Sequence, residues 1–404
     1  MFHFIICTYI IIFLLPVRTC HLNASKRSLP QYLSDKIIGK NTSLQIIEYL
    51  CGNMKVHIFN PENDMALADG TAGYTAPSNI RQMREELHWL PLWWAEDEDK
   101  VWNGEDTLEL KDGDEIRPWG WSPALVHQLR QAGVEDRFLP SSTELQKIRS
   151  LSHRRTAVDA LKKCREDGLL GERLAGWSML CQSEEEAEEA LSQWPEALLK
   201  APWSSSGRGV RFVDAETFSD NIRGWIRNTL SQQGSVMIEP YYNKVKDFGM
   251  EFMVDSEGKV GYCGLSLFST TGSAYTGNLL ATEYAKEQLL MPYLSAQVLS
   301  RLRIQLSEVL AQTVAPVYQG PIGVDMMVVT GHGSHAFLIH PCVEINLRCT
   351  MGHLALALSP HDDHDLQAVM NISFDKHHYH VRISDQSPKT FHQHVSSIHD
   401  MSLQ

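Results

Sequence analysis

The chain has 404 residues, of which 43% are hydrophobic and 21% are charged. This length suggests two or three domains, and the composition is ordinary for a soluble globular protein. The formal net charge of −13 argues against a general nucleic-acid-binding protein, which needs a basic face to displace counterions. It does not exclude anionic small molecules as substrates, because a local pocket can carry the opposite charge.

The chain opens with its only long apolar run, residues 2–17. The run has about the length of a signal-peptide core and is short for a membrane span, which needs roughly 20 residues. No positively charged segment precedes it, and a first strand begins abruptly after Met54 and Lys55. We therefore interpret residues 1–53 as an upstream leader, such as a misassigned start, so that membrane attachment is not expected. A genuine signal or anchor is the alternative.

The eight cysteines are dispersed along the chain and include no Cys-x-x-Cys pair. Three of them, Cys7, Cys20 and Cys51, lie in the leader. The remaining odd, scattered set is typical of free thiols in a reducing compartment, and it favours neither a disulfide framework nor a zinc site.

Strand and helix patterns alternate over residues 54–140, which predicts a small doubly wound α/β domain. Polar residues follow the first expected strand: Asn60, Asn63 and Asp64. Side chains there can contact a ligand, since open α/β sheets bind ligands at the carboxyl ends of their strands, or they can be ordinary turn and cap residues. The apolar segment Leu90–Ala95 predicts a buried strand. No Gly-x-Gly-x-x-Gly motif follows the first strand, so a dinucleotide fingerprint is absent.

An apolar strand that ends on Lys200 leads into a loop of serine and glycine, and a second strand begins at Val210. The loop residues are Ser205, Ser206, Gly207, Arg208 and Gly209. Glycines let the backbone approach a phosphate closely, and successive N–H groups with serine hydroxyls bind anions. Lys200 precedes the glycines, which excludes a Walker A loop. The segment is a candidate phosphate-binding loop, with a plain β-hairpin as the alternative.

Other polar groups surround this segment in the sequence. Arg154 and Arg155 can reach a phosphate, although a solvated helix face suits at least one of them. Glu239 ends a predicted strand that runs into an extended connector, where a carboxylate suits recognition of an adenine amino group. A β-hairpin that turns at residues 255–258 is expected next. The hydroxyl-rich segment Gly264–Asn278 is interpreted as a loop, either facing a substrate or lying on the surface.

Two segments near the carboxyl end carry a candidate metal site. Asp325 is the only charged residue of an apolar run, and a later strand alternates so that Glu344, Asn346 and Arg348 share one face. A hairpin turning at residues 330–335 would bring Asp325 beside them. Two carboxylates and an amide oxygen suit Mg²⁺, and a neighbouring guanidinium can hold a phosphate or carboxylate bidentately. An amphipathic strand with one solvated face is the alternative.

Taken in order, these motifs resemble the ATP-grasp superfamily over roughly residues 140–355. The resemblance is carried by the Lys200 strand with its Ser/Gly loop, by Glu239-x-x-Tyr242, by Asp247 opening the next strand, and by Asp325 with Glu344-x-Asn346-x-Arg348. It implies a pre-ATP-grasp-like domain over residues 54–140 and a two-subdomain ATP-grasp domain over residues 141–380. The expected fold class is thus α/β and α+β, followed by a polar, histidine-containing tail over residues 381–404.

The resemblance also implies roles for individual residues. The Ser/Gly loop, residues 205–209, would close over the phosphates of ATP, and Lys200 would contact the α and β phosphates. Glu239 and Tyr242 would hold the adenine, and Asp247 the ribose. Asp325, Glu344 and Asn346 would bind Mg²⁺ or Mn²⁺, and Arg348 would steady the transferring phosphoryl group. The stretch from Glu239 to Asp247 is longer than in compact ligases of the family, which weakens the ribose assignment.

Members of that family usually convert a carboxylate into an acylphosphate that an amine or a thiol then attacks. We therefore expect an ATP- and Mg²⁺-dependent ligase for a small-molecule carboxylate and an amine or thiol acceptor. Use of ATP favours a cytoplasmic location. A phosphotransferase on the same fold, or a nucleotide-binding module without turnover, are the alternatives. The C-terminal histidines, from His361 to His399, suggest a polar tail around a last strand, with a metal-binding tail as the other interpretation.

Overall fold

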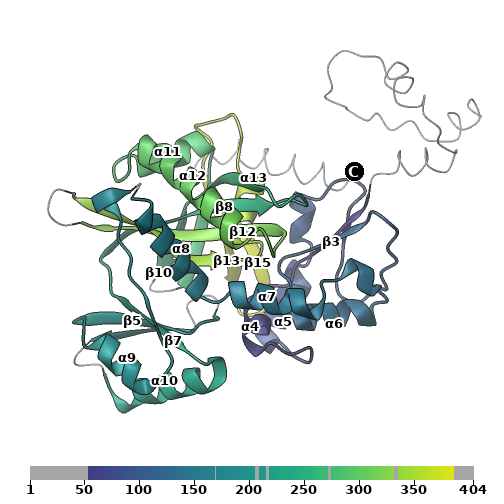
Figure 1. Cartoon of the computed structure of the whole chain (residues 1–404). Helices are drawn as coiled ribbons and strands as arrows, with labels where there is room; N and C mark the ends of the chain where they lie inside the picture. Colours follow the sequence, from purple (N-terminus) through teal and green to yellow (C-terminus); the bar gives the residue numbers. More distant parts are fainter. Residues whose placement is uncertain are drawn as a thin grey trace, which may run out of the picture. The chain divides into compact units, whose positions relative to one another are not determined.

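The computed structural model describes residues 53–168, 170–204, 209–214, 218–271, 274–331 and 335–385 (Figure 1). The leader up to residue 52 and the tail from residue 386 lie outside the described residues, as do Ser205, Ser206, Gly207 and Arg208 of the candidate phosphate loop. Within the described part of the chain, no helix is both long enough and apolar enough to span a membrane.

The amino-terminal unit is built on a three-stranded parallel sheet with the order β2-β1-β3. Its strands are β1 (Lys55–Ile58), β2 (Lys100–Val101) and β3 (Glu115–Pro118). Its helices are α4 (Asn63–Asp69), α5 (Ser78–Leu87), α6 (Pro123–Gln131), and the 3-10 turns η1 (Leu90–Trp93) and η2 (Asp136–Phe138). Val56 and Ile58 pack in one apolar cluster with Leu125 and Leu129 of α6, and this burial holds α6 on the sheet.

The strand expected at Leu90–Ala95 is wrong, because this segment begins with the 3-10 turn η1. Pro91 lies in the first turn, where a missing N–H has no cost and the fixed φ is already helical. The rings of Trp89 and Trp93 then meet edge to face at 5.1 Å. A continuous apolar run has no period that separates a buried strand from a buried turn.

The second sheet is antiparallel with the order β4-β7-β5-β6. Its strands are β4 (Met179–Cys181), β5 (Glu196–Lys200), β6 (Val210–Asp214) and β7 (Val236–Pro240). The helices α9 (Glu184–Leu191) and α10 (Asp220–Gln233) cover the same face of this sheet in Figure 1. Ala187, Ala190 and Ile226 of these helices pack on Val236 and Ile238, so the opposite face, where β5 ends on Lys200, stays available for chemistry.

The third sheet is also antiparallel and has the order β13-β12-β8-β9. Its strands are β8 (Lys244–Val254), β9 (Val260–Ser266), β12 (Gly320–Thr330) and β13 (Phe337–Asn346). One face buries Phe248, Met250 and Val324 in a core shared with α8 (Arg155–Glu166) and α12 (Ala296–Thr313). Because side chains alternate along a strand, the other face carries Asp247, Glu251 and Asp325. The hairpins predicted at residues 255–258 and 330–335 are both present.

The remaining elements complete the mixed α/β and α+β fold, whose predicted class is confirmed. A fourth sheet has the order β10-β11-β14-β15. Its strands are β10 (Phe268–Thr271), β11 (Ala274–Leu280), β14 (Ala368–Phe374) and β15 (Tyr379–Asp385). The helices not yet named are α7 (Ser142–Leu151), η3 (Gly171–Arg173), α11 (Glu283–Leu290) and α13 (Met351–Leu358). The interpretation of Gly264–Asn278 as a loop is therefore wrong: most of it forms strands, since hydroxyl side chains tolerate an edge-exposed sheet.

Helix α13 begins against Glu251, and only a glycine at position 352 permits this approach. A Cβ atom on Gly352 would lie 1.9 Å from Glu251 Oε1 and 2.6 Å from Ser266 Oγ. We predict that Gly352→Ala lowers the free energy of unfolding by about 1–3 kcal/mol, because overpacking forces the helix or the carboxylate to move. Urea unfolding measures this change.

The matched control is Gly224→Ala in α10, where an added Cβ meets no atom within 4 Å. This variant should be neutral or more stable by about 0.5–1 kcal/mol, since alanine is the better helix former. Equal effects of the two substitutions would contradict the packing described for α13.

Candidate functional site

Two carboxylates face each other across strands β12 and β13. Asp325 is the register partner of Glu344, and the amide nitrogen of Asn346 donates to Asp325 Oδ2 at 3.2 Å. The three side chains therefore lie together, as the predicted hairpin requires. Like charges directly opposite each other destabilise a sheet, so this pair lowers the stability of the folded state.

Arg348 lies beside this pair and is held by a carboxylate from the amino-terminal unit. Its Nε is 2.9 Å from Asp64 Oδ1, its Nη2 is 2.8 Å from Asp64 Oδ2, and Nη2 also donates to Asn346 Oδ1 at 3.0 Å. Burial alone would lower the pKa of Arg348, but Asp64, Glu344 and Asp325 raise it above its ordinary value. The guanidinium is thus a permanent positive charge at the edge of the carboxylate pair.

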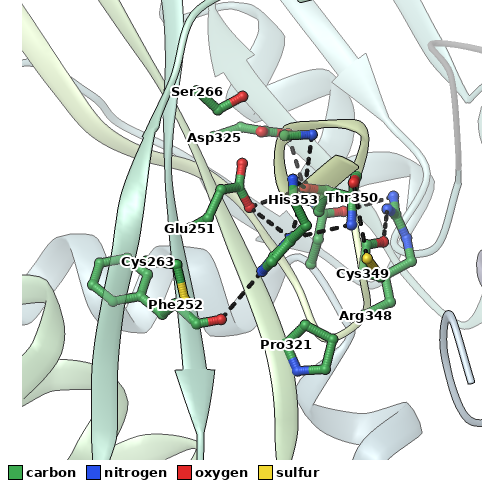
Figure 2. Close-up of polar contacts among 12 residues, drawn as sticks. Glu251, Phe252, Cys263, Ser266, Pro321, Asp325, Arg348, Cys349, Thr350 and His353 are labelled. Carbon is green, nitrogen blue, oxygen red and sulfur yellow. Dashed lines mark hydrogen bonds and ion pairs between the residues drawn. The ribbon is translucent and has the colours of Figure 1, made fainter. Parts of the chain in front are cut away.

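A third carboxylate, Glu251 on β8, lies near the pair and is almost fully buried (Figure 2). The hydroxyl of Thr350 donates to Glu251 Oε2 at 2.9 Å, and His353 Nδ1 is 3.1 Å from the same oxygen. His353 Nε2 lies 3.2 Å from the carbonyl oxygen of Phe252. Thr350 also caps α13, so the start of this helix is fixed by the same group that satisfies Glu251.

The negative charge around Asp325 would favour the binding of a cation. Burial, followed by the charges of Glu344 and Glu251, raises the pKa of Asp325 to about 7. A divalent cation beside Asp325 and Glu344 would relieve this repulsion. The described residues contain no group of three or more His, Cys, Asp or Glu side chains arranged for a metal. The two carboxylates and the side chain of Asn346 would suit Mg²⁺, with waters or phosphate oxygens as the other ligands.

A buried ion pair occupies the second sheet. The ammonium group of Lys200 contacts Glu239 Oε2, and both residues are 5% exposed. Burial acts to raise the pKa of Glu239, but the charge of Lys200 brings it below its ordinary value. Removing two charges from water has a large desolvation free energy, so a buried ion pair does not by itself stabilise the fold. A pair that stability does not explain is a candidate for ligand binding.

Arg154 links the two sheets. Its Nη1 is 3.0 Å from Glu344 Oε2, while Nε donates to the carbonyl of Ala201 at 3.0 Å and Nη2 to Ser204 Oγ at 3.2 Å. The guanidinium thus joins the carboxylate pair on the third sheet to the start of the Ser/Gly segment on the second. Of the two arginines considered from the sequence, Arg154 is buried here and Arg155 is exposed.

The other predicted residues lie around the same junction. Tyr242 packs edge-on against His340 with 5.8 Å between ring centroids. Asp247 accepts from Lys244 Nζ at 2.5 Å and from Thr270 Oγ1 at 2.7 Å. Gly209 closes the β5–β6 connection, where its carbonyl accepts from Ala201 N at 2.8 Å; a Cβ there would lie 2.4 Å from that of Ser204.

The sequence alone did not assign a role to three of these residues. From the sequence, Asp64 could contact a ligand or cap a helix, and its contact with Arg348 arises only in the folded chain. His340 belongs to an apolar stretch without a motif. Glu251 had a detectable signal, since Asp247, Gly249 and Glu251 alternate on β8 as Glu344 and Asn346 do on β13, and strands with one polar face belong together.

Comparisons with known proteins give structural likeness only. No family model and no curated protein matches the chain. Solved structures similar to it include an ADP complex of N5-carboxyaminoimidazole ribonucleotide synthetase, with a TM-score of 0.46 and 13% identity over 87% of this chain and 98% of that one.

Two further similar structures are an ATP-grasp superfamily protein from Archaeoglobus fulgidus and D-alanyl-alanine synthetase A from Vibrio cholerae. The first has a TM-score of 0.43 and 13% identity over 83% of this chain and 100% of that one. The second has a TM-score of 0.41 and 12% identity over 76% of this chain and 93% of that one. Identities and scores of this size assign neither a substrate nor an activity to this chain.

The raised pKa of Asp325 predicts a specific dependence of stability on pH. A carboxyl whose pKa is higher in the folded state than in the unfolded chain, where it is about 3.9, stabilises the fold at low pH. This contribution is lost as the pH rises from about 4 through about 7. We expect the wild type to lose stability between pH 5 and pH 8 relative to Asp325→Asn, as measured by thermal unfolding without divalent cations.

Adding Mg²⁺ at pH 8 should then stabilise the wild type and leave Asp325→Asn unchanged, because binding to the folded state raises its stability. Identical pH profiles for the two proteins, or an equal response of both to Mg²⁺, would show that Asp325 neither carries this titration nor binds the metal.

Proposed function

We propose that this protein is an ATP- and Mg²⁺-dependent ligase that joins a small-molecule carboxylate to an amine or thiol. The observation that carries the proposal is the link made by Arg154 between the Asp325–Glu344 pair and the strand end that bears Lys200. The carboxylate pair and the end of the strand that bears Lys200 therefore lie at one junction, and in this proposal the pair binds the metal and the lysine binds phosphate. Positioning and charge neutralisation are what phosphoryl transfer requires of a protein.

The residues divide into groups by charge. Lys200, Arg154 and Arg348 would offset the negative charge of the phosphates, and Asp325, Glu344 and Asn346 would hold Mg²⁺, which would neutralise further phosphate charge when bound. Glu239, released from Lys200, would accept a hydrogen bond from the adenine amino group. Asp247 would bind the ribose hydroxyls in exchange for Lys244 and Thr270.

In the proposed reaction, an oxygen of the substrate carboxylate attacks the γ-phosphorus of ATP, and ADP leaves. The nitrogen of an amine, or the sulfur of a thiol, then attacks the carbonyl carbon of the acylphosphate and loses its proton to water, and phosphate leaves with the bonding electron pair. The permanent charge of Arg348 would stabilise the transferring phosphoryl group in the first step and the departing phosphate in the second. Use of ATP favours the cytoplasm as the location of the reaction.

We predict that Glu344→Gln and Lys200→Ala each lower turnover by at least about 100-fold while the folds stay intact. Glu344→Gln removes a negative charge that would hold Mg²⁺, and Lys200→Ala removes a positive charge that would face the phosphates. The measurement is ADP and phosphate release from Mg-ATP in a small-metabolite extract, with circular dichroism as the fold check. The matched controls are Glu189→Gln and Lys162→Ala, which change the same groups at exposed positions and should keep wild-type rates. Wild-type rates in either site variant would refute the assignment.

The products decide between the ligase and its alternatives. Equal amounts of ADP and phosphate, formed only with the wild type and the two controls, support the ligase. ADP without matching phosphate indicates a phosphotransferase, whose phosphorylated product is stable. Binding of Mg-ATP without consumption in the extract favours a nucleotide-binding module.

A further inference from the structure

His340 on β13 is a buried histidine that the proposed chemistry does not use. It is 2% exposed, and neither of its ring nitrogens has a hydrogen-bond partner among the residues that the structure describes. Burial lowers its pKa to about 4, so at neutral pH the ring carries one N–H donor and one acceptor nitrogen. Buried polar atoms in folded proteins nearly always have partners, and each exception calls for an explanation.

The side chain lies on the same face of the third sheet as the carboxylate pair. His340 is the register partner of Met327, which stands two residues after Asp325 on β12. Directly paired residues project from the same face of a sheet, and so do residues two apart on one strand. His340 therefore belongs to the face that carries Asp325 and Glu344, at the end nearer Tyr242.

The surroundings of His340 come from both sheets. The ring of Tyr242 meets it edge-on, and the charges of Glu239 and Lys200 both act on it. The connector that enters the second sheet passes directly over the ring: the backbone N–H of Ala175 donates to the carbonyl of Ile339 at 2.7 Å. At Gly176, with φ of +107°, an added Cβ would lie 2.8 Å from the ring. The backbone at Gly176 therefore lies directly against the ring of His340, where no larger residue would fit.

A purely structural role explains these facts poorly. The neighbours Ala175, Val329 and Leu338 form a small apolar cluster with Tyr242 and Met327, and an apolar ring at position 340 would pack there without leaving polar atoms unpaired. An unpaired buried polar group destabilises the folded state. The partner of such a group can be an ordered water, an ion or a bound ligand, and a position that lowers stability is often one that function requires.

We propose that His340 is a specificity-determining residue that hydrogen-bonds the purine base of the nucleotide, beside Lys200 and Glu239. The inference rests on the proposed function, because it requires a nucleotide at the junction of the two sheets. The edge of adenine that carries N7 and the amino group presents an acceptor next to a donor, and a neutral imidazole can pair with either. His340 would recognise the base alone, whereas Arg154, Arg348 and the metal ligands act on the phosphates.

The test compares binding of Mg-ATP and of inorganic tripolyphosphate by the full chain, with isothermal titration calorimetry. His340→Phe should weaken binding of Mg-ATP by about tenfold, the size of one lost hydrogen bond, and leave tripolyphosphate binding unchanged. His340→Gln, which keeps a donor and an acceptor, should restore part of the affinity. Without ligand, the melting temperature of His340→Phe should equal or exceed that of the wild type.

The matched control is His57→Phe, which makes the same change at a buried histidine that has a partner, Asp99 Oδ2 at 2.9 Å. This variant should lose thermal stability and keep its affinity for Mg-ATP. Unchanged Mg-ATP affinity in both His340 variants would overturn the inference and leave the proposed function standing. Equal losses for Mg-ATP and tripolyphosphate would also overturn it. A wild type that binds neither ligand would overturn both proposals.

Discussion

The site depends on the repulsion between Asp325 and Glu344, which are directly paired across two strands. A sheet does not place two carboxylates opposite each other without compensation, and each surrounding group supplies part of it. Asn346 donates to Asp325, Arg154 pairs with Glu344, and Arg348 lies alongside. The compensation is incomplete, since burial, together with the charges of Glu344 and Glu251, keeps the pKa of Asp325 raised to about 7. A site that keeps a residual negative potential is suited to a divalent cation.

Arg348, one of the groups that offset this repulsion, also links the two parts of the chain. Arg348 is orientated by Asp64 of the amino-terminal unit, and the next residue, Cys349, donates its backbone N–H to the carbonyl of Trp119 at 2.6 Å. Arg149 in turn donates to the carbonyls of Leu67 and Ala68 at the end of α4 and lies over the ring of Trp203. The amino-terminal unit therefore contacts both Arg348, which follows β13, and Arg149, which lies over Trp203 just before the Ser/Gly segment.

The sequence predicted those parts of the site that rest on local periodicity. Alternation on one strand placed Glu344, Asn346 and Arg348 on one face, and a glycine-rich turn brought Asp325 opposite them. The sequence could not predict contacts between residues that are far apart in the chain and meet only in the folded structure. Asp64 meets Arg348 across 284 residues, and His340 carries no local signal. The errors at Leu90–Ala95 and Gly264–Asn278 arise because apolar runs and hydroxyl-rich runs lack a distinctive period, and packing then decides between strand, turn and loop.

The most direct test is a crystal structure of the protein with Mg²⁺ and a non-hydrolysable ATP analogue. We predict electron density for the metal between Asp325 and Glu344, phosphates beside Lys200 and Arg154, and the base against Glu239 and His340. The structure also has a cavity of about 940 Å³ elsewhere, lined by His57, Trp94 and Tyr318 among others. Nucleotide bound in that cavity, with no metal at the carboxylate pair, would contradict the account.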